Sequence, residues 1–345
     1  MAGSDRSSAD TLVVNEATPA LTRRSVLQAG IAGGAAITGV TLAAGAATPD
    51  GAATAPAAAP LSRTARYREM LKGCFYAPAI DDPLEAKLMV RAGIRGAIVS
   101  GIVASYRAGF ADLAMASATE ILDVARELCD AADINLLVDL EDGKGSPLHL
   151  FRWIKETERT GASAAMIDDS SFHGHLWQPK GKVITQEEMV DKIKAAVDAR
   201  TDPNFVIMAS PVGLREGHSE NETLDRGAAY AEAGADLFWF PGGSADFLRK
   251  AKRIVERPLV WTALGTTISA DEKALMNDKI VNVVVIDGYR SIAAGAIAAA
   301  IDEFLKTGST VNAAKGALSD DAMAALDIRY TSQQIHEMAK KYHVK

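Results

Sequence analysis

The amino-acid sequence predicts an α/β protein, a (β/α)8 TIM barrel with extra C-terminal helices. From residue 61 onward, short apolar runs rich in β-forming residues alternate eight times with amphipathic segments of helical period. Uninterrupted apolar strands separated by helices are typical of a parallel sheet covered by helices. Eight such units in roughly 250 residues fit a closed barrel better than a doubly wound open sheet, which is the alternative because it needs no closure.

The predicted elements follow one another in regular order. The strands are expected at Gly73–Ala77, Ala97–Ser100, Asn135–Asp139, Ala164–Asp168, Phe205–Ala209, Leu237–Phe240, Leu259–Thr262 and Val281–Ile286. The helices are expected at Ser62–Leu71, Pro83–Ala92, Ala118–Ala131, Leu148–Thr160, Gln186–Ala199, Glu222–Ala233, Ala245–Glu256, Ala270–Lys279 and Ile292–Lys306. The tail from Leu318 to Lys345 adds one or two helices, whose apolar residues pack either on this barrel or on a neighbouring subunit.

The composition is that of a globular protein whose main partner is not nucleic acid. Of the 345 residues, 48% are apolar and 23% are charged, and the net charge is −7. An acidic balance without a basic stripe argues against nucleic-acid binding. The two cysteines, Cys74 and Cys129, lie in apolar surroundings, and we expect buried free thiols rather than a disulfide.

The first 48 residues are predicted to be an export signal rather than part of the fold. Arg23 and Arg24 precede an uncharged stretch from Ala29 to Pro49 that contains the small-residue sequence Ala44-Gly45-Ala46. Paired arginines before a weakly apolar, glycine-rich run are typical of a twin-arginine signal. The run approaches the length of a membrane span, but its alanine and glycine content favours cleavage over a permanent anchor. The remaining parts are an Ala/Pro linker (49–60), the barrel (61–310) and a C-terminal helical extension (311–345).

Carboxylates gather at the ends of the third and fourth predicted strands. The third strand leads into Asp139-Leu140-Glu141-Asp142-Gly143, and the fourth ends at Asp168 and Asp169. In a barrel the active site lies at the C-terminal ends of the strands. Carboxylates on two neighbouring strand ends repel one another unless protons or a cation neutralise them, although each loop alone could be a solvated acidic turn. Because no Cys/His ligand set lies nearby, the oxygen ligands favour Mg²⁺, with Mn²⁺ as the alternative, over zinc.

The loop after the fourth strand carries a pair of histidines. His173 and His175 flank Gly174 within the polar segment Ser170–Lys182. A histidine can act as an acid or a base near neutral pH, so this loop is a candidate for proton transfer. The alternative is a surface loop with incidental histidines.

Taken together, these residues resemble the isocitrate lyase / phosphoenolpyruvate mutase superfamily. The layout is most similar to its methylisocitrate lyase-like, or carboxyvinyl-carboxyphosphonate phosphorylmutase-like, branch, from about Leu71 to about Gly308. The motifs that carry the resemblance are Ala77–Asp82, Val99-Ser100-Gly101, Ala111–Ala114, Val138–Gly145, Ile167–Ser170 and Ala229–Asp236. Each motif alone is weak, but the set in this order is specific.

The resemblance implies roles for individual residues. In that family the acids hold a Mg²⁺ that binds an α-oxo acid and stabilises the enolate formed when a C–C or C–P bond breaks. Asp139, Glu141 and Asp168 are therefore expected to contact the metal directly or through water. The residues expected to bind the substrate are Ser100, Gly101, Asp112 and Gly174.

Two departures from the family pattern fall on the reactive side of the predicted site. The lyases carry Lys-Arg-Cys-Gly-His in the loop after the fourth strand, with the cysteine as general acid; His173 stands at the cysteine position here, and His175 is retained. The lyases' Ala-Arg-Thr-Asp, whose arginine clamps a substrate carboxylate, is replaced by Ala209-Ser210-Pro211-Val212. Arg215 or Lys180 could take over this contact from a loop.

The sequence thus predicts an exported Mg²⁺-dependent lyase that cleaves a C–C bond in a small 2-oxo or 2-hydroxy carboxylic acid. His173 and His175 are the expected catalytic residues. The alternatives are an oxo-acid hydrolase or decarboxylase, or a C–P phosphomutase, on the same metal site, and a non-catalytic barrel that binds a small acid or a protein. The twin-arginine export machinery is the expected route to a periplasmic or extracellular location. Members of the family are commonly tetramers that exchange C-terminal helices, which implies a homo-oligomer, either a tetramer or a dimer.

Overall fold

The computed structural model describes residues 61–112, 114–171, 182–263, 267–319, 322–323, 325–326 and 332–344. The predicted export signal and linker lie outside these ranges, as do His173, Gly174 and His175. The described residues belong to one compact unit, Ala59–Lys345. The predicted residue roles in the histidine loop therefore stay predictions.

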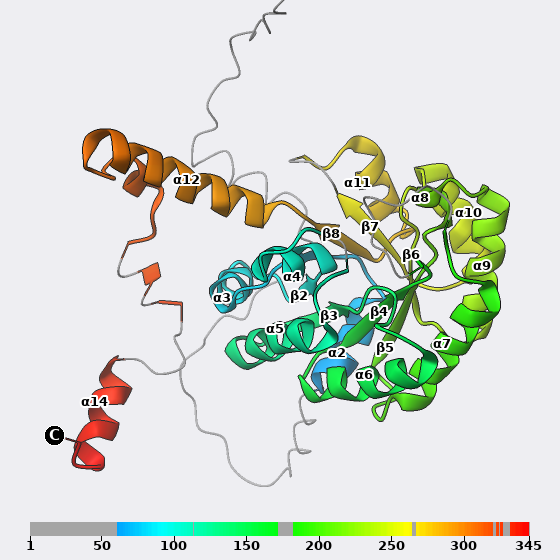
Figure 1. Cartoon of the computed structure of the whole chain (residues 1–345), viewed down its shortest axis with the longest axis horizontal. Helices are drawn as coiled ribbons and strands as arrows, with labels where there is room; N and C mark the ends of the chain where they lie inside the picture. Colours follow the sequence, from blue (N-terminus) through cyan, green and yellow to red (C-terminus); the bar gives the residue numbers. More distant parts are fainter. Residues whose placement is uncertain are drawn as a thin grey trace, which may run out of the picture. The chain divides into compact units, whose positions relative to one another are not determined.

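Eight parallel strands form one ring-like sheet (Figure 1). The strands are β1 (Phe75–Pro78), β2 (Gly96–Val99), β3 (Asn135–Asp139), β4 (Ala164–Asp168), β5 (Val206–Ser210), β6 (Leu237–Trp239), β7 (Leu259–Ala263) and β8 (Val283–Ile286). Neighbours along the chain pair in parallel from β2 to β8, and β8 pairs in parallel with β1. Between β1 and β2 the ring closes through a bridge of Ala79 with Ile98. The predicted (β/α)8 barrel is confirmed, and the open sheet is excluded.

Helices follow the strands around the outside of the barrel (Figure 1). They are α2 (Arg63–Met70), α3 (Pro83–Arg91), α4 (Gly101–Arg107), α5 (Ala118–Ala131), α6 (Pro147–Arg159), α7 (Gln186–Ala199), α8 (Gly213–Glu216), α9 (Glu220–Glu232), α10 (Ala245–Val255), α11 (Ala270–Asn277) and α12 (Tyr289–Thr307). The tail adds a 3-10 helix (Ala313–Gly316) and α14 (Ser332–Lys341). Two short helices, α4 and α8, were not predicted, because one or two turns are too short to show a helical period.

The first and last strands begin two residues later than predicted, and one side chain explains both differences. The Asn282 side-chain amide donates to the carbonyls of Leu71 (2.9 Å) and Gly73 (3.0 Å), and its Oδ1 accepts the Leu259 N–H (3.2 Å). These side-chain hydrogen bonds satisfy backbone groups that a longer strand ladder would otherwise pair. The apolar pattern alone could not distinguish the two arrangements.

Two separate apolar clusters make up the core, one inside the barrel and one between the strands and the helices. Successive residues of a strand point to opposite faces of the sheet. In β3, Leu137 belongs to the inner cluster and Val138 to the outer one, and in β4 the inner position belongs to Met166. The next inward-facing positions are Asp139 and Asp168. The alternation therefore directs these two carboxylates into the C-terminal end of the barrel.

Helix α2 closes the opposite, N-terminal end of the barrel. Tyr67 is fully buried in the inner cluster, with its ring edge-on to Phe75 at 5.6 Å. Arg68 donates to the carbonyls of Asn204 (3.1 Å) and Phe205 (3.2 Å), at the start of β5, and pairs with Asp236 at 3.0 Å. Among the described residues, the cavity that reaches the barrel interior lies at the opposite, C-terminal end.

Both cysteines are free thiols, as predicted. Cys129 is buried in α5, whereas Cys74 is only half-buried, because it precedes β1 instead of lying within the strand. In the part of the chain that the structure describes, no helix combines the length and the apolar character needed to cross a bilayer.

Helix α12 differs from the other long helices because none of its 19 residues is buried. Its start is tied to the loop after β1, where Arg290 pairs with the buried Asp81 at 2.9 Å. Its large apolar side chains are 55–76% exposed, namely Ile292, Ile297, Ile301, Phe304 and Leu305. An apolar helix of this length that stays exposed is typical of an interaction surface. In the tail, Leu326 is buried. Ile335, in α14, and Tyr342, the residue after α14, are exposed.

Candidate active site

A cavity of about 230 Å³ occupies the C-terminal end of the barrel. Its floor is apolar and consists of Ile98, Met166, Met208, Val260 and Val285. Its wall carries the last inward-facing residues of six strands, namely Ser100, Asp139, Asp168, Trp239, Thr262 and Asp287. A larger cavity of about 700 Å³ lies among α2 and the starts of β1 and β3, far from every predicted site residue. The smaller cavity is the candidate active site because the carboxylates converge there.

Asp139 is held at the end of β3 by two backbone amides. Its Oδ1 accepts the Glu141 N–H at 2.8 Å, and its Oδ2 accepts the Gly101 N–H at 3.1 Å. Burial raises the pKa of Asp139 well above its usual range, and the nearby Glu141 and Asp168 carboxylates raise it further. The side chain is fixed in orientation, and it favours a proton or a cation beside it.

Glu141 presents one unpartnered carboxylate oxygen. Its Oε2 accepts the ammonium of Lys144, which also donates to the Ala114 carbonyl at 3.0 Å. Its Oε1 is buried and has no hydrogen-bond partner among the described residues. A Cβ at Gly101 would lie 2.5 Å from this oxygen, so a larger residue there would displace the Glu141 carboxylate. Burial raises the pKa of Glu141 to about 7, although Lys144 opposes the shift.

The other polar groups of the cavity come from β2, β4, β8 and the segment after α4. Asp168 accepts hydrogen bonds at Oδ1 from the Ser170 N–H (3.0 Å) and the Ser170 hydroxyl (2.5 Å). The buried Oγ of Ser100 has no partner among the described residues. Burial raises the pKa of Asp287, and the Asp112 carboxylate raises it further. Four aspartates with Ser100 therefore surround one small volume.

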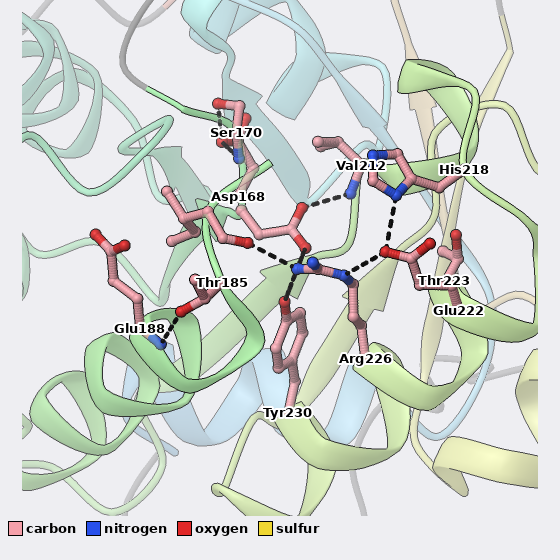
Figure 2. Close-up of polar contacts among 12 residues, drawn as sticks. Asp168, Ser170, Thr185, Glu188, Val212, His218, Glu222, Thr223, Arg226 and Tyr230 are labelled. Carbon is pink, nitrogen blue, oxygen red and sulfur yellow. Dashed lines mark hydrogen bonds and ion pairs between the residues drawn. The ribbon is translucent and has the colours of Figure 1, made fainter. Parts of the chain in front are cut away.

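Asp169, the next residue after Asp168, belongs to a different environment. It is fully buried and accepts the Val212 N–H at 2.8 Å, the Tyr230 hydroxyl at 2.8 Å and Arg226 Nη1 at 3.2 Å. Figure 2 shows Val212, from the segment after β5, and Arg226 and Tyr230, from α9, gathered at this point. Burial raises the pKa of Asp169, and the hydrogen bonds from Val212 and Tyr230 oppose that shift. This acid links β4, β5 and α9, and it is not a site residue.

The donor set fits a magnesium ion that keeps part of its water shell. No three His, Cys, Asp or Glu side chains among the described residues are close enough to form a complete ligand set. Mg²⁺ commonly binds through one or two carboxylates plus water and substrate oxygens, so a closed protein cage is not required. Asp139 and Asp168 open into the same cavity, and the unpartnered Glu141 oxygen lies beside Gly101. All of these donors are oxygens, which suits Mg²⁺ or Mn²⁺.

The structure brings together most of the residues that the sequence singled out. Five of them line the cavity, namely Ser100, Gly101, Asp112, Asp139 and Asp168. Glu141 does not line it directly. The three residues of the histidine loop lie outside the described residues. Three wall residues were not predicted as site residues, namely Trp239, Thr262 and Asp287, and counting in twos from the inner apolar residues of β6, β7 and β8 would have found them.

Arg215 also lines the cavity; it was not assigned to the site, although the sequence suggested it as a replacement clamp. It comes from α8, a single turn after β5. Its position depends on how the segment after β5 folds back over the barrel end. No local pattern in the sequence signals that fold.

Comparison with known proteins places this architecture in a family. Residues 67–305 match the family model of phosphoenolpyruvate phosphomutase. This chain belongs to the phosphoenolpyruvate phosphomutase family. The resemblance predicted from the motifs is therefore confirmed.

Named members of the family carry out several reactions. The chain is 37% identical over 194 residues to a 2-methylisocitrate lyase of Shewanella oneidensis, a match that covers 53% of this chain and 64% of that protein. It is 32% identical over 195 residues to a 2,3-dimethylmalate lyase of Eubacterium barkeri, covering 55% and 67% of the two chains. The structure of a phosphonopyruvate hydrolase with oxalate and Mg²⁺ superposes with a TM-score of 0.70 at 25% identity, covering 83% of this chain and 100% of that one. All three relatives are enzymes, as the sequence predicts for this chain.

Proposed function

We propose that this protein is a Mg²⁺-dependent lyase that cleaves a C–C bond in a small 2-oxo or 2-hydroxy carboxylic acid. The observation that carries the proposal is the convergence of Asp139 and Asp168 on one small cavity with an apolar floor. The matches to two carbon–carbon lyases favour this reaction over the other reactions of the family.

Asp139 and Asp168, with Glu141 behind Gly101, are the residues proposed to hold the ion, directly or through water. When bound, Mg²⁺ supplies a Lewis acid where negative charge develops on the substrate oxygen. The Ser100 hydroxyl, buried and without a partner among the described residues, is available to donate to a substrate carboxylate.

We propose that His173 donates the proton that ends the reaction, with His175 as its neighbour in the same loop. This assignment rests on the sequence alone. A histidine at the position of the family's cysteine retains a proton donor that titrates near neutral pH. Gly174 between the two histidines is the proposed substrate-binding glycine of this loop.

The experiment that tests the function follows the fragments of the reaction. The protein is incubated with a panel of 2-oxo and 2-hydroxy dicarboxylic acids and with a 2-oxo phosphonic acid, each with Mg²⁺ or with EDTA, and the products are identified by ¹H and ³¹P NMR. We expect two carbon fragments from at least one acid, only with Mg²⁺, and loss of this activity in Asp139→Ala. Release of CO₂ or phosphate instead would establish the decarboxylase or C–P alternative. Metal-dependent binding without any product would establish the non-catalytic barrel.

We also propose that a second copy of this chain covers α12. In a (β/α)8 barrel the last helix normally packs on the sheet, yet α12 has no buried residue, and Tyr76 of β1 is 38% exposed. A dimer or tetramer that exchanges this region would cover both surfaces. We expect Ile297→Glu with Leu305→Glu to give a smaller species in analytical ultracentrifugation, whereas Arg253→Gln on α10 leaves the mass unchanged.

The proposed location is periplasmic or extracellular, after twin-arginine export. The proposal rests on Arg23 and Arg24 and on the uncharged run that follows them. Replacing both arginines by lysine should leave the protein in the cytoplasm in a fractionation experiment, and normal export of that variant would refute the assignment.

A further inference from the structure

The larger cavity of about 700 Å³, which lies beside α2, has no part in the proposed function. Its walls come from α2, the turn after α3 and the starts of β1 and β3. Small-molecule sites commonly occupy about 300–1,000 Å³. We propose that this space, termed the α2 cavity, binds a small aromatic acid that carries an N–H or O–H on its ring. The proposal is independent of the proposed function, since the α2 cavity and the candidate active site share no described lining residue.

The apolar part of the α2 cavity is rigid and partly aromatic. Its side chains are those of Leu61, Met70, Phe75, Tyr76 and Ile94. A Cβ at Gly96 would lie 2.5 Å from the Phe75 ring, so this ring lies directly against the start of β2. The ring also meets Tyr67 edge to face, with 5.6 Å between the ring centroids. Because an aromatic ring gains additional energy from contact with another ring, this wall favours a flat aromatic ligand over an aliphatic one.

The buried end of the α2 cavity carries the side-chain amide of Asn135. This residue lines the cavity and is 2% exposed, and its Oδ1 has no hydrogen-bond partner among the described residues. Its Nδ2 donates to the Arg95 carbonyl at 3.0 Å and lies 3.3 Å from Met70 Sδ, and these contacts fix the orientation of the amide. A buried acceptor without a donor is costly, so a bound group that donates to it is favoured. An N–H or O–H on the ring of the ligand meets this requirement.

The charged residues of the lining leave one positive charge for a ligand. Arg66 donates to both carboxylate oxygens of Asp133, at 3.0 and 2.5 Å. Glu69 accepts from Lys72 at 2.6 and 2.8 Å. The remaining charged residue of the lining, Arg95, is exposed and makes no ion pair with any described residue. A guanidinium can bind a carboxylate through two parallel hydrogen bonds, so Arg95 favours a ligand with an acid group.

The acceptor and the cation are held close to each other by the sheet. The Arg95 carbonyl accepts both the backbone N–H of Asn135 at 2.8 Å and its side-chain amide at 3.0 Å. Gly96, the residue after Arg95, lies opposite Asn135 in the parallel pairing of β2 with β3. Because Asn135 is buried and Arg95 is exposed, the acceptor lies inside the cavity and the cation at its rim. One ring system with its carboxylate on a short side chain suits this arrangement.

Three probes of similar shape test the proposal by calorimetry on the whole chain in EDTA. Indole-3-acetate carries the ring N–H and the carboxylate, indole-3-acetamide lacks the charge, and 1-naphthaleneacetate lacks the N–H. We expect the wild type to bind indole-3-acetate about 10- to 100-fold more tightly than indole-3-acetamide, and about 3- to 10-fold more tightly than 1-naphthaleneacetate. Arg95→Gln should abolish the preference for the acetate over the acetamide. Ile94→Trp, which places a larger side chain in the cavity, should weaken the binding of all three probes.

Two further variants control for binding elsewhere on the protein. Arg253→Gln removes the same charge from the exposed surface of α10, and Asp168→Asn changes the candidate active site; both should bind indole-3-acetate as the wild type does. Weaker binding in either control would place the probe outside the α2 cavity and overturn the proposal. So would equal affinities of the wild type for the acetate and the acetamide, or an unchanged preference in Arg95→Gln. If no probe bound, the proposal would fail, and a smaller species of Tyr76→Glu in analytical ultracentrifugation would show that a second copy fills the cavity instead.

Discussion

Asp168 and Asp169 are consecutive residues whose side chains lie in different environments. Asp168 turns into the barrel and lines the cavity, where Ser170 is the only described residue that donates hydrogen bonds to its carboxylate. Asp169 turns outward and receives three donors, from Val212, Arg226 and Tyr230. The alternation of side chains along β4 separates the two environments.

A buried carboxylate can act in the site or in the scaffold, depending on its hydrogen-bond partners. The scaffold carboxylate has a full set of donors inside the protein, so its burial is compensated. Burial raises the pKa of Asp139 and Glu141 as it raises that of Asp169, but Glu141, unlike Asp169, keeps one oxygen without a hydrogen-bond partner among the described residues. These groups favour protons or a cation from outside.

The largest effect on stability is expected from removing the buried Asp169 carboxylate. Asp169→Ala removes the buried carboxylate partner of Arg226, which keeps only the more distant Glu222 carboxylate (3.6 Å) among the described residues, and it removes the acceptor of the Val212 N–H. We expect the free energy of unfolding to fall by about 3–5 kcal/mol, as for other broken buried pairs. Urea denaturation measures this loss. A stability equal to that of the wild type would mean that the network does not hold β4 to α9.

The site acids should instead make the stability depend on pH in the metal-free protein. The pKa of Glu141 is raised from its ordinary value to about 7, so the folded state favours the protonated form. This contribution is fully present below about pH 4.5 and is lost as the pH rises through 7, an effect of about 2–3 kcal/mol. In EDTA, the wild type should lose that much stability between pH 4.5 and 8 relative to Glu141→Gln. If the difference in stability between the wild type and Glu141→Gln stayed constant over this pH range, the prediction would be contradicted.

Asp168→Asn tests the role of Asp168, the neighbour of Asp169 that lines the cavity. Because this carboxylate is proposed to bind Mg²⁺, its removal should weaken Mg²⁺ binding at least about tenfold, as for other groups around metal sites. The free energy of unfolding without metal should change by less than about 1 kcal/mol, because no buried cation loses its partner. Calorimetric titration with Mg²⁺ and urea denaturation measure the two quantities. A variant with normal Mg²⁺ binding but low stability would make Asp168 a scaffold residue.

A smaller effect than that of Asp169→Ala is expected for Tyr230→Phe. It removes the hydroxyl that donates to Asp169 and accepts from Arg226 Nη1 at 3.2 Å, and it leaves the Arg226 and Val212 contacts to Asp169 in place. The loss of these two hydrogen bonds corresponds to about 1–2 kcal/mol of stability. Urea denaturation should therefore place this variant between the wild type and Asp169→Ala, with Mg²⁺ binding unchanged. A loss as large as that of Asp169→Ala would show that the network depends on the hydroxyl rather than on the ion pair.

The sequence by itself determined the barrel, nearly all of its elements and five of the residues that line the cavity. These follow from local rules: apolar runs give the strands, helical periods give the covering helices, and alternation decides that Asp139 and Asp168 face inward. The motifs around Ser100 and Glu141 were sufficient to predict the family, which the match over residues 67–305 then confirmed. The same alternation would also have found Asp287.

Only the tertiary structure decided which distant residues meet. Asp169 is bound by Arg226, 57 residues further along the chain, and no local pattern links the two. Arg215 reaches the cavity because the loops after β5 and β6 are packed together, and α12 remains exposed although its sequence is apolar enough to be buried. Such contacts depend on closure of the whole barrel, since they join groups whose separation along the chain leaves their separation in space undetermined.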